Sequence, residues 1–537
     1  MKAISNSFQL TKKQFYWGMV IILLLAVLLR FYKLGQVPHG MAWDEAAIGY
    51  NGFAIFTTRR DEWLIRLPVS FWSFGDYKAP LAIYLNGIFT HFFGMNLWAV
   101  RLPFALSGVM AVGGMIYLGR LLAIKSGENL GRARLLGLLA GGLLAFSPWH
   151  HHFSRVGFES GLALTLVIWG IYFFYRALEV KFEWRRYLDF SLAILSFVAS
   201  VYAYHSAKIT IPLLVLLLIL KQKKEIIIHW KSFLTTSVLG LISIWPLVRD
   251  SLFGNGLERA GTLIISRATS TWQVLKLMTS NFGAHFSTSF LLKGATTTLR
   301  HGDGHWGVLL LTTFWLVIVG LVYLLIKNQR QVKQVTLGGL GLAIMMLGIL
   351  PAALGSEIPH ANRSLLALPG FILLAVFGFQ CLLNSKLSAT MKNLLVGMFI
   401  LFHGLFFISY LRDYYTVFVS QSAMAFQDGY LEAFQFVIPY ERGEQGKTAV
   451  DKIIFTSDYG QPYIYALFAR KTNPIWYQGG SLIKYEFKDE INIGDTERPN
   501  TIVVAGPTDD LLSKNFSADK LILGSDGLVR FRIYINQ

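Results

Sequence analysis

Charged residues are scarce in this sequence of 537 residues, and acids are the scarcer kind. Only 15% of the residues are charged, against about a quarter in soluble domains, and 31 acids face 49 lysines and arginines. Together with 54% apolar residues, this composition excludes an ordinary soluble globular protein. The chain has one cysteine, Cys381, so an internal disulfide is excluded and the redox compartment cannot be inferred from it.

Nucleotide-binding motifs are also absent. The sequence has no Walker loop, no Rossmann glycine pattern and no D-x-D signature, which argues against a nucleotide-activated substrate. No cofactor is predicted, because no spacing of ligand residues supports a metal. The net charge of +18 does not indicate nucleic acid, since the cations are dispersed in short loops between apolar runs. That distribution fits membrane lipids with anionic headgroups.

Long apolar runs are what the sequence has instead, and each of roughly 18 residues or more can cross a bilayer as a helix. We predict a polytopic all-α membrane protein of about eleven transmembrane helices. The short run at 82–94 is interpreted as a re-entrant or surface segment. The predicted spans are 15–33, 98–120, 134–149, 157–176, 187–204, 208–221, 232–249, 306–326, 335–354, 363–383 and 393–411.

The positive-inside rule gives an orientation to these spans. Every second short loop is rich in Lys and Arg, at 120–134, 176–186, 221–231, 327–333 and 386–392, and is predicted to be cytoplasmic. The membrane domain covers 1–411, with two long outward loops at 34–97 and 250–305 that are expected to be functional. In the first, AAIGYNGFAIF and LPVSFWSF suit short helices in the interface plane.

The composition changes after about residue 411. DKIIFTS, TIVVAG, KLILGS and VRFRIYI are typical of strands, and QPYIYALFAR of a helix between two of them. Residues 412–537 are therefore expected to form a small, soluble, extracytoplasmic α/β domain. It has no glycine-rich nucleotide fingerprint, so no catalytic role is predicted for it.

Two acids stand side by side in the first outward loop, Asp44 and Glu45 in AWDEAAIGYNG. Neighbouring residues of a helix point about 100° apart, so the two carboxylates cannot act on one atom together and must differ in role. One can serve as a general base while the other binds a basic partner or the backbone. In the structural alternative, which spacing alone favours, Asp44 caps a surface helix and Glu45 interacts with its dipole.

Cations and imidazoles on the outward side supply possible phosphate ligands. Lys78, in GDYKAPLAIYL, is a compact charge suited to a lipid phosphate, although a snorkelling anchor would have the same pattern. Taken singly, such groups are more often solvated at the interface than part of a site. The further candidates for phosphate binding are Tyr204, Arg300, His301, His360 and Arg363. The histidines at 150–152 with Asp303 and His305 form an alternative zinc set, but their spacing is not compact.

Three segments give the chain a resemblance to a known family. The acid pair in WDEAA, the lysine in DYKAPL and the stretch RLPFALSG at 101–108 follow an oily first span and precede a soluble tail. In this combination they resemble the GT-C glycosyltransferases, and most of all the protein mannosyltransferase and aminoarabinose transferase superfamily. The resemblance extends over residues 15–410, and the acid pair is its most specific mark.

The resemblance implies a sugar donor carried on a polyprenyl phosphate and inversion at the anomeric carbon. It also implies that Asp44 is the base or the group that orients the acceptor, that Glu45 supports it, and that Lys78 contacts the phosphate. Ala79, which follows this lysine, departs from the commoner Lys-Pro spacing. The remaining phosphate candidates follow from their position in outward loops and not from a motif.

The sequence therefore predicts a glycosyltransferase of the plasma membrane and cell envelope, acting at the outer face on a lipid, glycan or protein acceptor. A transporter or flippase of lipid-linked sugars is the alternative, but it would usually show paired half-chain symmetry and charges at the midplane, which the sequence lacks. A structural scaffold would leave the opposed outward charges without a purpose.

Overall fold

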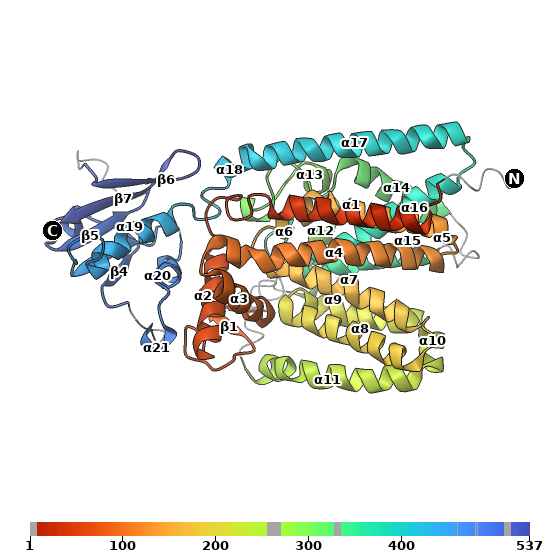
Figure 1. The fold of residues 1–537 in the computed structure, drawn as a ribbon, viewed down its shortest axis with the longest axis horizontal. Helices are drawn as coiled ribbons and strands as arrows, with labels where there is room; N and C mark the ends of the chain where they lie inside the picture. Colours follow the sequence, from red (N-terminus) through yellow and green to blue (C-terminus); the bar gives the residue numbers. More distant parts are fainter. Residues whose placement is uncertain are drawn as a thin grey trace. The chain divides into compact units, whose positions relative to one another are not determined.

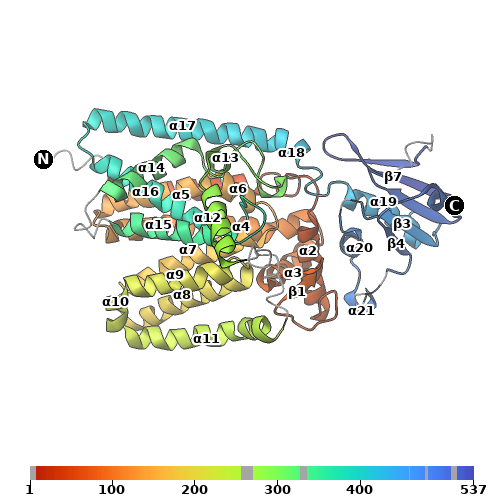
Figure 2. The same ribbon diagram turned by 180° about the vertical axis from the view of Figure 1, so that it is seen from behind.

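The computed structural model describes residues 8–254, 270–326, 335–458, 460–477, 480, 482–509 and 517–536. The chain forms two compact units (Figures 1 and 2). Unit 1 comprises Met1–Tyr32 and Phe104–Arg412, and unit 2 comprises Lys33–Pro103 and Asp413–Gln537. Residues 255–269 of the second predicted outward loop and the cytoplasmic loop predicted at 327–333 lie outside the described residues.

Unit 1 consists of helices and loops in its described part. Its α-helices, two of which extend into unit 2 at one end, are α1 (Lys12–Phe31), α4 (Leu97–Lys125), α5 (Leu130–Ala145), α6 (Pro148–Phe153), α7 (Glu159–Ala177), α8 (Glu183–Ala203), α9 (Ala207–Lys221), α10 (Lys223–Ile228), α11 (Trp230–Phe253), α12 (Thr271–Ala284), α13 (Thr288–Leu292), α14 (Leu311–Ile326), α15 (Val335–Ala353), α16 (Leu368–Asn384) and α17 (Ala389–Tyr415). Two 3-10 turns, η4 (Leu299–His301) and η6 (Leu365–Ala367), complete it.

A helix occupies each of the eleven predicted spans. Seven helical segments in the described residues are long and apolar enough to cross a membrane, and two shorter apolar helices accompany them. The seven are Lys12–Phe31, Leu97–Lys125, Glu159–Ala177, Glu183–Ala203, Trp230–Phe253, Leu365–Asn384 and Ala389–Gln421. The chain is thus a multi-pass membrane protein, while the count of eleven spans stays a prediction.

Helix α16 lies at the centre of unit 1, with α14 and α15 packed against it. Small residues allow this close approach: a Cβ at Gly378 would lie 2.0 Å from Leu316 O of α14, and one at Gly370 would lie 2.3 Å from Met345 N of α15. Helices α11 and α17 lie on opposite sides of the bundle (Figures 1 and 2). Both expose many apolar side chains, as lipid-facing helices do.

Unit 2 combines the first predicted outward loop with the C-terminal segment. Its helices are α2 (Trp43–Thr58), α3 (Pro80–Phe93), α18 (Val417–Gln421), α19 (Tyr430–Arg442), α20 (Pro462–Arg470), α21 (Pro474–Tyr477) and α22 (Ile493–Thr496). Its strands are β1 (Phe71–Ser73), β2 (Asp76–Lys78), β3 (Lys452–Thr456), β4 (Tyr485–Lys488), β5 (Thr501–Ala505), β6 (Lys520–Leu523) and β7 (Val529–Asn536). The β1–β2 pair forms a hairpin, and the other strands form one sheet in the order β4-β3-β5-β7-β6.

The larger sheet is mixed and is covered by apolar side chains on both faces. Strands β4, β3 and β5 run parallel, while β7 is antiparallel to β5 and β6. Alternate residues of β3 and β5 enter opposite clusters: Ile453 and Ile502 join the larger one, Ile454 and Val503 the smaller one. The larger cluster also contains Tyr50 of α2, so the first loop and the C-terminal segment share one core.

One local prediction is wrong. The stretch LPVSFWSF was expected to be a short interfacial helix, but it contains β1 and leads into the hairpin turn. Leu67 and Phe74 have positive φ angles of 44° and 56°, which no α-helix contains, and Pro68 removes a backbone donor. Between these limits the chain is extended, with Phe71 and Ser73 buried on one face.

Candidate active site

The acid pair lies in the first turn of α2. Ala42 precedes the helix in an extended conformation, and its backbone N–H donates to Glu45 Oε2 at 3.0 Å, so the glutamate reaches back to satisfy the helix start. Gly52 allows α2 to pack directly on α3, because a Cβ there would lie 2.7 Å from Gly87 N. The backbone that carries both acids is therefore held at its N-terminal end and along its length.

Glu45 is a fully buried structural acid. Arg101 donates Nε to Glu45 Oε1 at 2.7 Å and Nη2 to Oε2 at 2.9 Å, a bidentate ion pair in which both side chains have no exposed surface. The same guanidinium also donates to three backbone carbonyls of the segment before α2, those of Leu34, Pro38 and Gly40. Glu45 thus fixes the helix, as expected of the acid that turns to a basic partner.

Asp44 points to a different partner, Lys78 at the end of β2. The two side chains form a part-buried ion pair, in which Asp44 keeps 22% of its side chain exposed and Lys78 is buried with 9% exposed. The hairpin positions the lysine by pairing it with Phe71 of β1, and its Nζ also lies 5.4 Å from the centroid of the Phe74 ring. A carboxylate and an ammonium therefore sit together in a part-buried position of unit 2.

A second acid in unit 2, Glu62, is completely buried. Its Oε1 accepts hydrogen bonds from Ser73 Oγ at 2.9 Å and Asn51 Nδ2 at 3.2 Å, while its Oε2 has no hydrogen-bond partner among the described residues. Burial raises the pKa of this carboxyl to about 7, against the hydrogen bonds from Ser73 and Asn51 and the positive charge of Lys78. The residue connects α2 to the hairpin that carries the lysine.

In unit 1, the three consecutive histidines are buried on α6 and face three different partners. His150 Nδ1 lies 2.7 Å from Arg30 Nη2, and His151 Nδ1 lies 2.8 Å from Tyr410 Oη. His152 Nε2 lies 2.8 Å from a backbone carbonyl in η4. They therefore act as separate contacts between helices and loops, and not as the joint zinc ligands considered from the sequence. Asp303, another member of that set, accepts the backbone N–H groups of the residues at 305 and 306.

Four of the predicted phosphate ligands lie in two loops of unit 1. The carbonyl that His152 contacts belongs to Arg300, and the neighbouring ring of His301 lies 4.4 Å from that of His360, centroid to centroid. The backbone N–H of Arg363 donates to His360 Nδ1 at 3.3 Å. Arg363 Nη1 is buried without a hydrogen-bond partner among the described residues, so it is a cationic donor with unused capacity.

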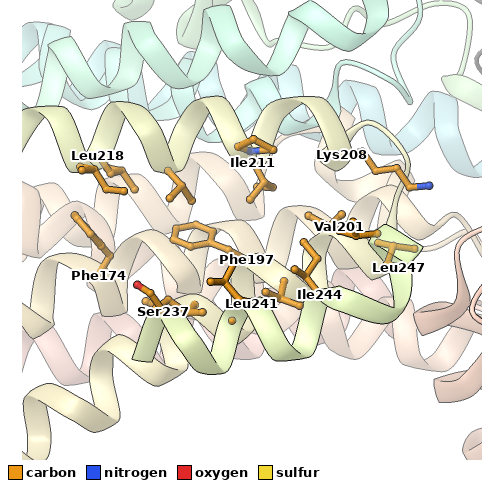
Figure 3. A pocket seen from close by; sticks show the side chains of 18 of the residues that line it. Phe174, Phe197, Val201, Lys208, Ile211, Leu218, Ser237, Leu241, Ile244 and Leu247 are labelled. Carbon is orange, nitrogen blue, oxygen red and sulfur yellow. The ribbon is translucent and has the colours of Figure 1, made fainter. Parts of the chain in front are cut away.

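An apolar groove of about 680 Å³ lies between α7, α8, α9 and α11 in the same unit. Figure 3 shows Lys208 at one end and Leu218 at the other, with Phe197 and Ile211 between them. Tyr204, the last predicted phosphate ligand, is buried in the α8–α9 turn near the lysine end. The groove therefore has an apolar length and a cationic end.

Comparison with known proteins gives matches among solved structures alone, since no family model and no curated protein matches the sequence. The chain is similar to ArnT from Cupriavidus metallidurans in the apo state, with 11% identity, coverage of 96% of this chain and 97% of that one, and a TM-score of 0.52. The same protein bound to undecaprenyl phosphate matches with 12% identity, the same coverage and a TM-score of 0.54.

A third match is the archaeal oligosaccharyltransferase AglB from Archaeoglobus fulgidus in complex with an inhibitory peptide and a dolichol-phosphate. It has 12% identity and a TM-score of 0.50, over 85% of this chain and 63% of that one. At such identities the similarity shows a shared fold. The GT-C fold expected from the acid pair and its companion segments is confirmed by these matches.

Sequence reasoning missed two residues of unit 2. Arg101 was noted as part of RLPFALSG, but nothing in that motif indicates that its side chain binds Glu45. Glu62 sits in the polar stretch RRDEW, where an acid is usually solvated, and its burial follows from contacts with α2 and β1, each eleven positions away. The sequence did offer one signal for Glu62, because Asp61 and Glu62 form a second pair of adjacent acids in the same loop.

Proposed function

We propose that the protein is an integral-membrane glycosyltransferase that transfers a sugar from a polyprenyl-phosphate carrier to an acceptor at the outer face of the plasma membrane. The observation that carries this proposal is the part-buried Asp44–Lys78 pair, with the aspartate partly exposed, on a scaffold with the GT-C fold. A sugar phosphate already has a good leaving group. The protein therefore has to remove a proton from the acceptor and stabilise the charge that grows on the departing phosphate.

In this mechanism Asp44 accepts the proton from the acceptor hydroxyl or amine as the acceptor atom bonds to the anomeric carbon. The bond from that carbon to the phosphate oxygen breaks with its electron pair on the phosphate, and Lys78 stabilises that charge. A single displacement of this kind inverts the anomeric carbon. The two side chains neutralise each other in their ion pair, and a bound phosphate would compete with Asp44 for the lysine.

Unit 1 supplies the groups that we assign to the lipid carrier. Arg363 is the best supported, because its Nη1 has unused hydrogen-bonding capacity. Arg300, His301, His360 and Tyr204 are proposed as further phosphate ligands by their chemistry and their place in predicted outward loops. The apolar groove with Lys208 at its end suits the isoprenoid chain of such a carrier. In support, one structural neighbour was solved with undecaprenyl phosphate and another with a dolichol-phosphate.

The experiment is transfer of a labelled sugar from polyprenyl phosphate to a candidate acceptor by the purified protein in detergent. Asp44→Asn keeps the shape of the side chain but cannot accept a proton at neutral pH, so the rate should fall by a factor of at least about 100. Asp489→Asn, at an exposed position of unit 2, is the matched control and should keep the parent rate. A correctly inserted Asp44→Asn protein that transfers sugar as fast as the parent would refute the assignment of the base.

The same assay separates an enzyme from a flippase. A flippase moves a lipid between two leaflets, so it gives no measurable product without a sealed bilayer. Formation of the glycosylated acceptor in detergent supports the transferase. Lipid movement in vesicles with no product in detergent, tested with lipid, glycan and protein acceptors, would favour the transporter.

A further inference from the structure

Three potential metal ligands other than the acid pair meet in unit 2. They are His39, in the segment before α2, Asp428, just before α19, and Glu432, in the first turn of α19. One ligand atom from each lies within 4.8 Å of the other two. The aspartate is fully buried, the histidine side chain is 42% exposed, and the glutamate is exposed. The cluster therefore sits at the surface with one anchored ligand.

Both backbone segments that carry these ligands are held in place. Arg101 donates to the carbonyls on either side of His39, those of Pro38 and Gly40. Asp428 uses Oδ2 to accept the backbone N–H of Ser525 at 2.7 Å, which leaves its Oδ1 directed at the imidazole. The two segments are also in close contact, because a Cβ at Gly40 would lie 2.9 Å from the Asp428 Cα. The ligand set is thus largely preformed.

A cavity of about 410 Å³ adjoins the cluster and gives it access to solvent. His39 and Glu432 both line it, together with Asn96 and Gln435. Three protein ligands beside an open cavity are the arrangement in which a metal keeps a fourth position for water. The cavity is a second feature that points to a ligand, because a purely structural ion pair needs no space beside it.

The donor atoms fit a divalent transition metal. One imidazole nitrogen and two carboxylate oxygens are ligands that Zn²⁺ binds at roughly 2.0–2.2 Å, so neighbouring donors in a tetrahedral site lie about 3.3 Å apart. His39 Nδ1 and Asp428 Oδ1 are 2.7 Å apart, which is the distance of a hydrogen bond that a proton occupies. Replacing that proton by a metal requires the pair to open by about half an ångström. Two carboxylates also neutralise the charge of the ion.

We propose that His39, Asp428 and Glu432 form a binding site for a divalent transition metal ion, best matched to Zn²⁺, that fastens the segment before α2 to the start of α19. None of these three residues is the proposed base or a proposed ligand of the lipid phosphate, and we assign the metal no catalytic role. Its effect reaches α2 through Gln427, the residue before the aspartate, whose Oε1 accepts the Trp43 N–H at 3.2 Å. Metal binding should therefore stabilise unit 2 around the first turn of α2.

A proton competes with the metal for this site. The hydrogen bond to Asp428, with the charges of Asp428 and Glu432, raises the pKa of the His39 imidazole, while burial and Arg101 oppose the rise. Only the neutral imidazole binds a metal, so a proton and a metal ion compete for the same nitrogen. The alternative to a metal site is a permanent protonated bridge between the imidazole and its two carboxylates.

The experiment uses the untagged full-length protein in detergent, stripped with a chelator, equilibrated with Zn²⁺ and passed over a desalting column. The parent should retain about one zinc per chain by elemental analysis, and its melting temperature should rise with zinc. His39→Ala and Glu432→Gln should lose both effects. Because Glu432 is exposed, its variant tests the site without a risk to folding. His91→Ala and Glu444→Gln, two exposed residues of unit 2, are the matched controls and should behave as the parent.

Parallel loadings with Mn²⁺ and Mg²⁺ test the ligand preference, since Mg²⁺ takes oxygen ligands and should not be retained. If His39→Ala and Glu432→Gln retained as much zinc as the parent, the proposal would be overturned. A parent that retains no zinc after desalting, and does not shift in melting temperature with zinc at pH 8, would overturn it equally. None of these readouts depends on sugar transfer, so failure here and failure of the proposed function are separate outcomes.

Discussion

Glu62 shows how one buried side chain makes unit 2 sensitive to pH. Its pKa rises from 4.5 to about 7 in the folded chain, so the folded state holds a proton that the unfolded state releases between these values. Stability from this residue is fully present below pH 4.5 and is lost as the pH rises through about 7. The size of the change is about 3 kcal/mol over this window.

Glu62→Gln should remove this dependence, because the amide is neutral at every pH. Relative to the parent, the variant should gain stability between pH 5 and pH 8 by up to about 3 kcal/mol. The measurement is chemical denaturation in detergent at both pH values. Glu444→Gln, an exposed acid with 55% of its side chain in solvent, should show no such trend. If the free energies of unfolding of Glu62→Gln and of the parent changed equally between the two pH values, the assigned protonation of Glu62 would be wrong.

At the scale of residues, the sequence predicted that the two adjacent acids have different roles, but not which side chains they bind. The 100° step of a helix was enough to expect that Asp44 and Glu45 would have separate roles, and the structure gives them separate cations. Nothing in the sequence indicated that Arg101 would pair with Glu45, since the two are 56 positions apart. Whether Asp44 is the base stays a proposal, because the geometry of an ion pair does not report a reaction.

Among the elements, the β1–β2 hairpin positions Lys78 through a turn of two residues. Phe74 and Gly75 both have positive φ, 56° and 72°, as a type I′ turn requires, and this twist matches that of the strands. An Ala at Gly75 would meet no atom within 4 Å, so any effect must come from the backbone angle alone.

Gly75→Ala should therefore destabilise unit 2 by about 1 kcal/mol, and transfer activity should fall because the lysine is less well placed. Gly494→Ala is the matched control: it also has open space around it, but it lies inside α22 with an ordinary φ, and alanine there should be neutral or slightly stabilising. Thermal denaturation of both variants measures the difference. Equal melting temperatures would argue against strain at the turn.

Most helices and strands could be predicted from the sequence, and the strength of the local sequence pattern explains both these successes and the one wrong prediction, LPVSFWSF. Long apolar runs and buried β-strands such as TIVVAG carry a strong local signal, and each appears where expected. The segment LPVSFWSF is short and aromatic, and periodicity does not separate a strand from an interfacial helix at that length. Its turn depends on positive φ at a phenylalanine, which a sequence pattern does not predict.

At the scale of the molecule, unit 2 is built from two distant parts of the chain. The core that surrounds Tyr50 contains Phe434, Phe455 and Phe531 from the C-terminal segment. Hydrogen bonds join the parts as well: Tyr465 Oη donates to Met41 O at 2.6 Å. The sequence predicted a separate soluble domain without a catalytic role, whereas the structure packs that segment against the helix that carries Asp44.

A chain that ends after residue 412 should therefore keep its membrane helices but lose the structure of residues 34–97. Removal of the C-terminal segment exposes the apolar face of α2, which cannot remain folded in water. Limited proteolysis should cut the truncated chain within 34–97 at protease concentrations that leave the parent intact. Cleavage sites in the loops of unit 1 serve as the internal control, and protection of 34–97 in the truncated chain would contradict the shared core.

This division of one core between both ends of the chain sets an order of events during synthesis. Asp44 leaves the ribosome early, while Ile533, which completes the same core, is added almost at the end of translation. At about 5–20 residues per second, the interval is on the order of tens of seconds to a minute or more. During that time the nascent polypeptide holds an unfinished core beneath the helix that carries the proposed base, so a prematurely terminated chain should lack this core.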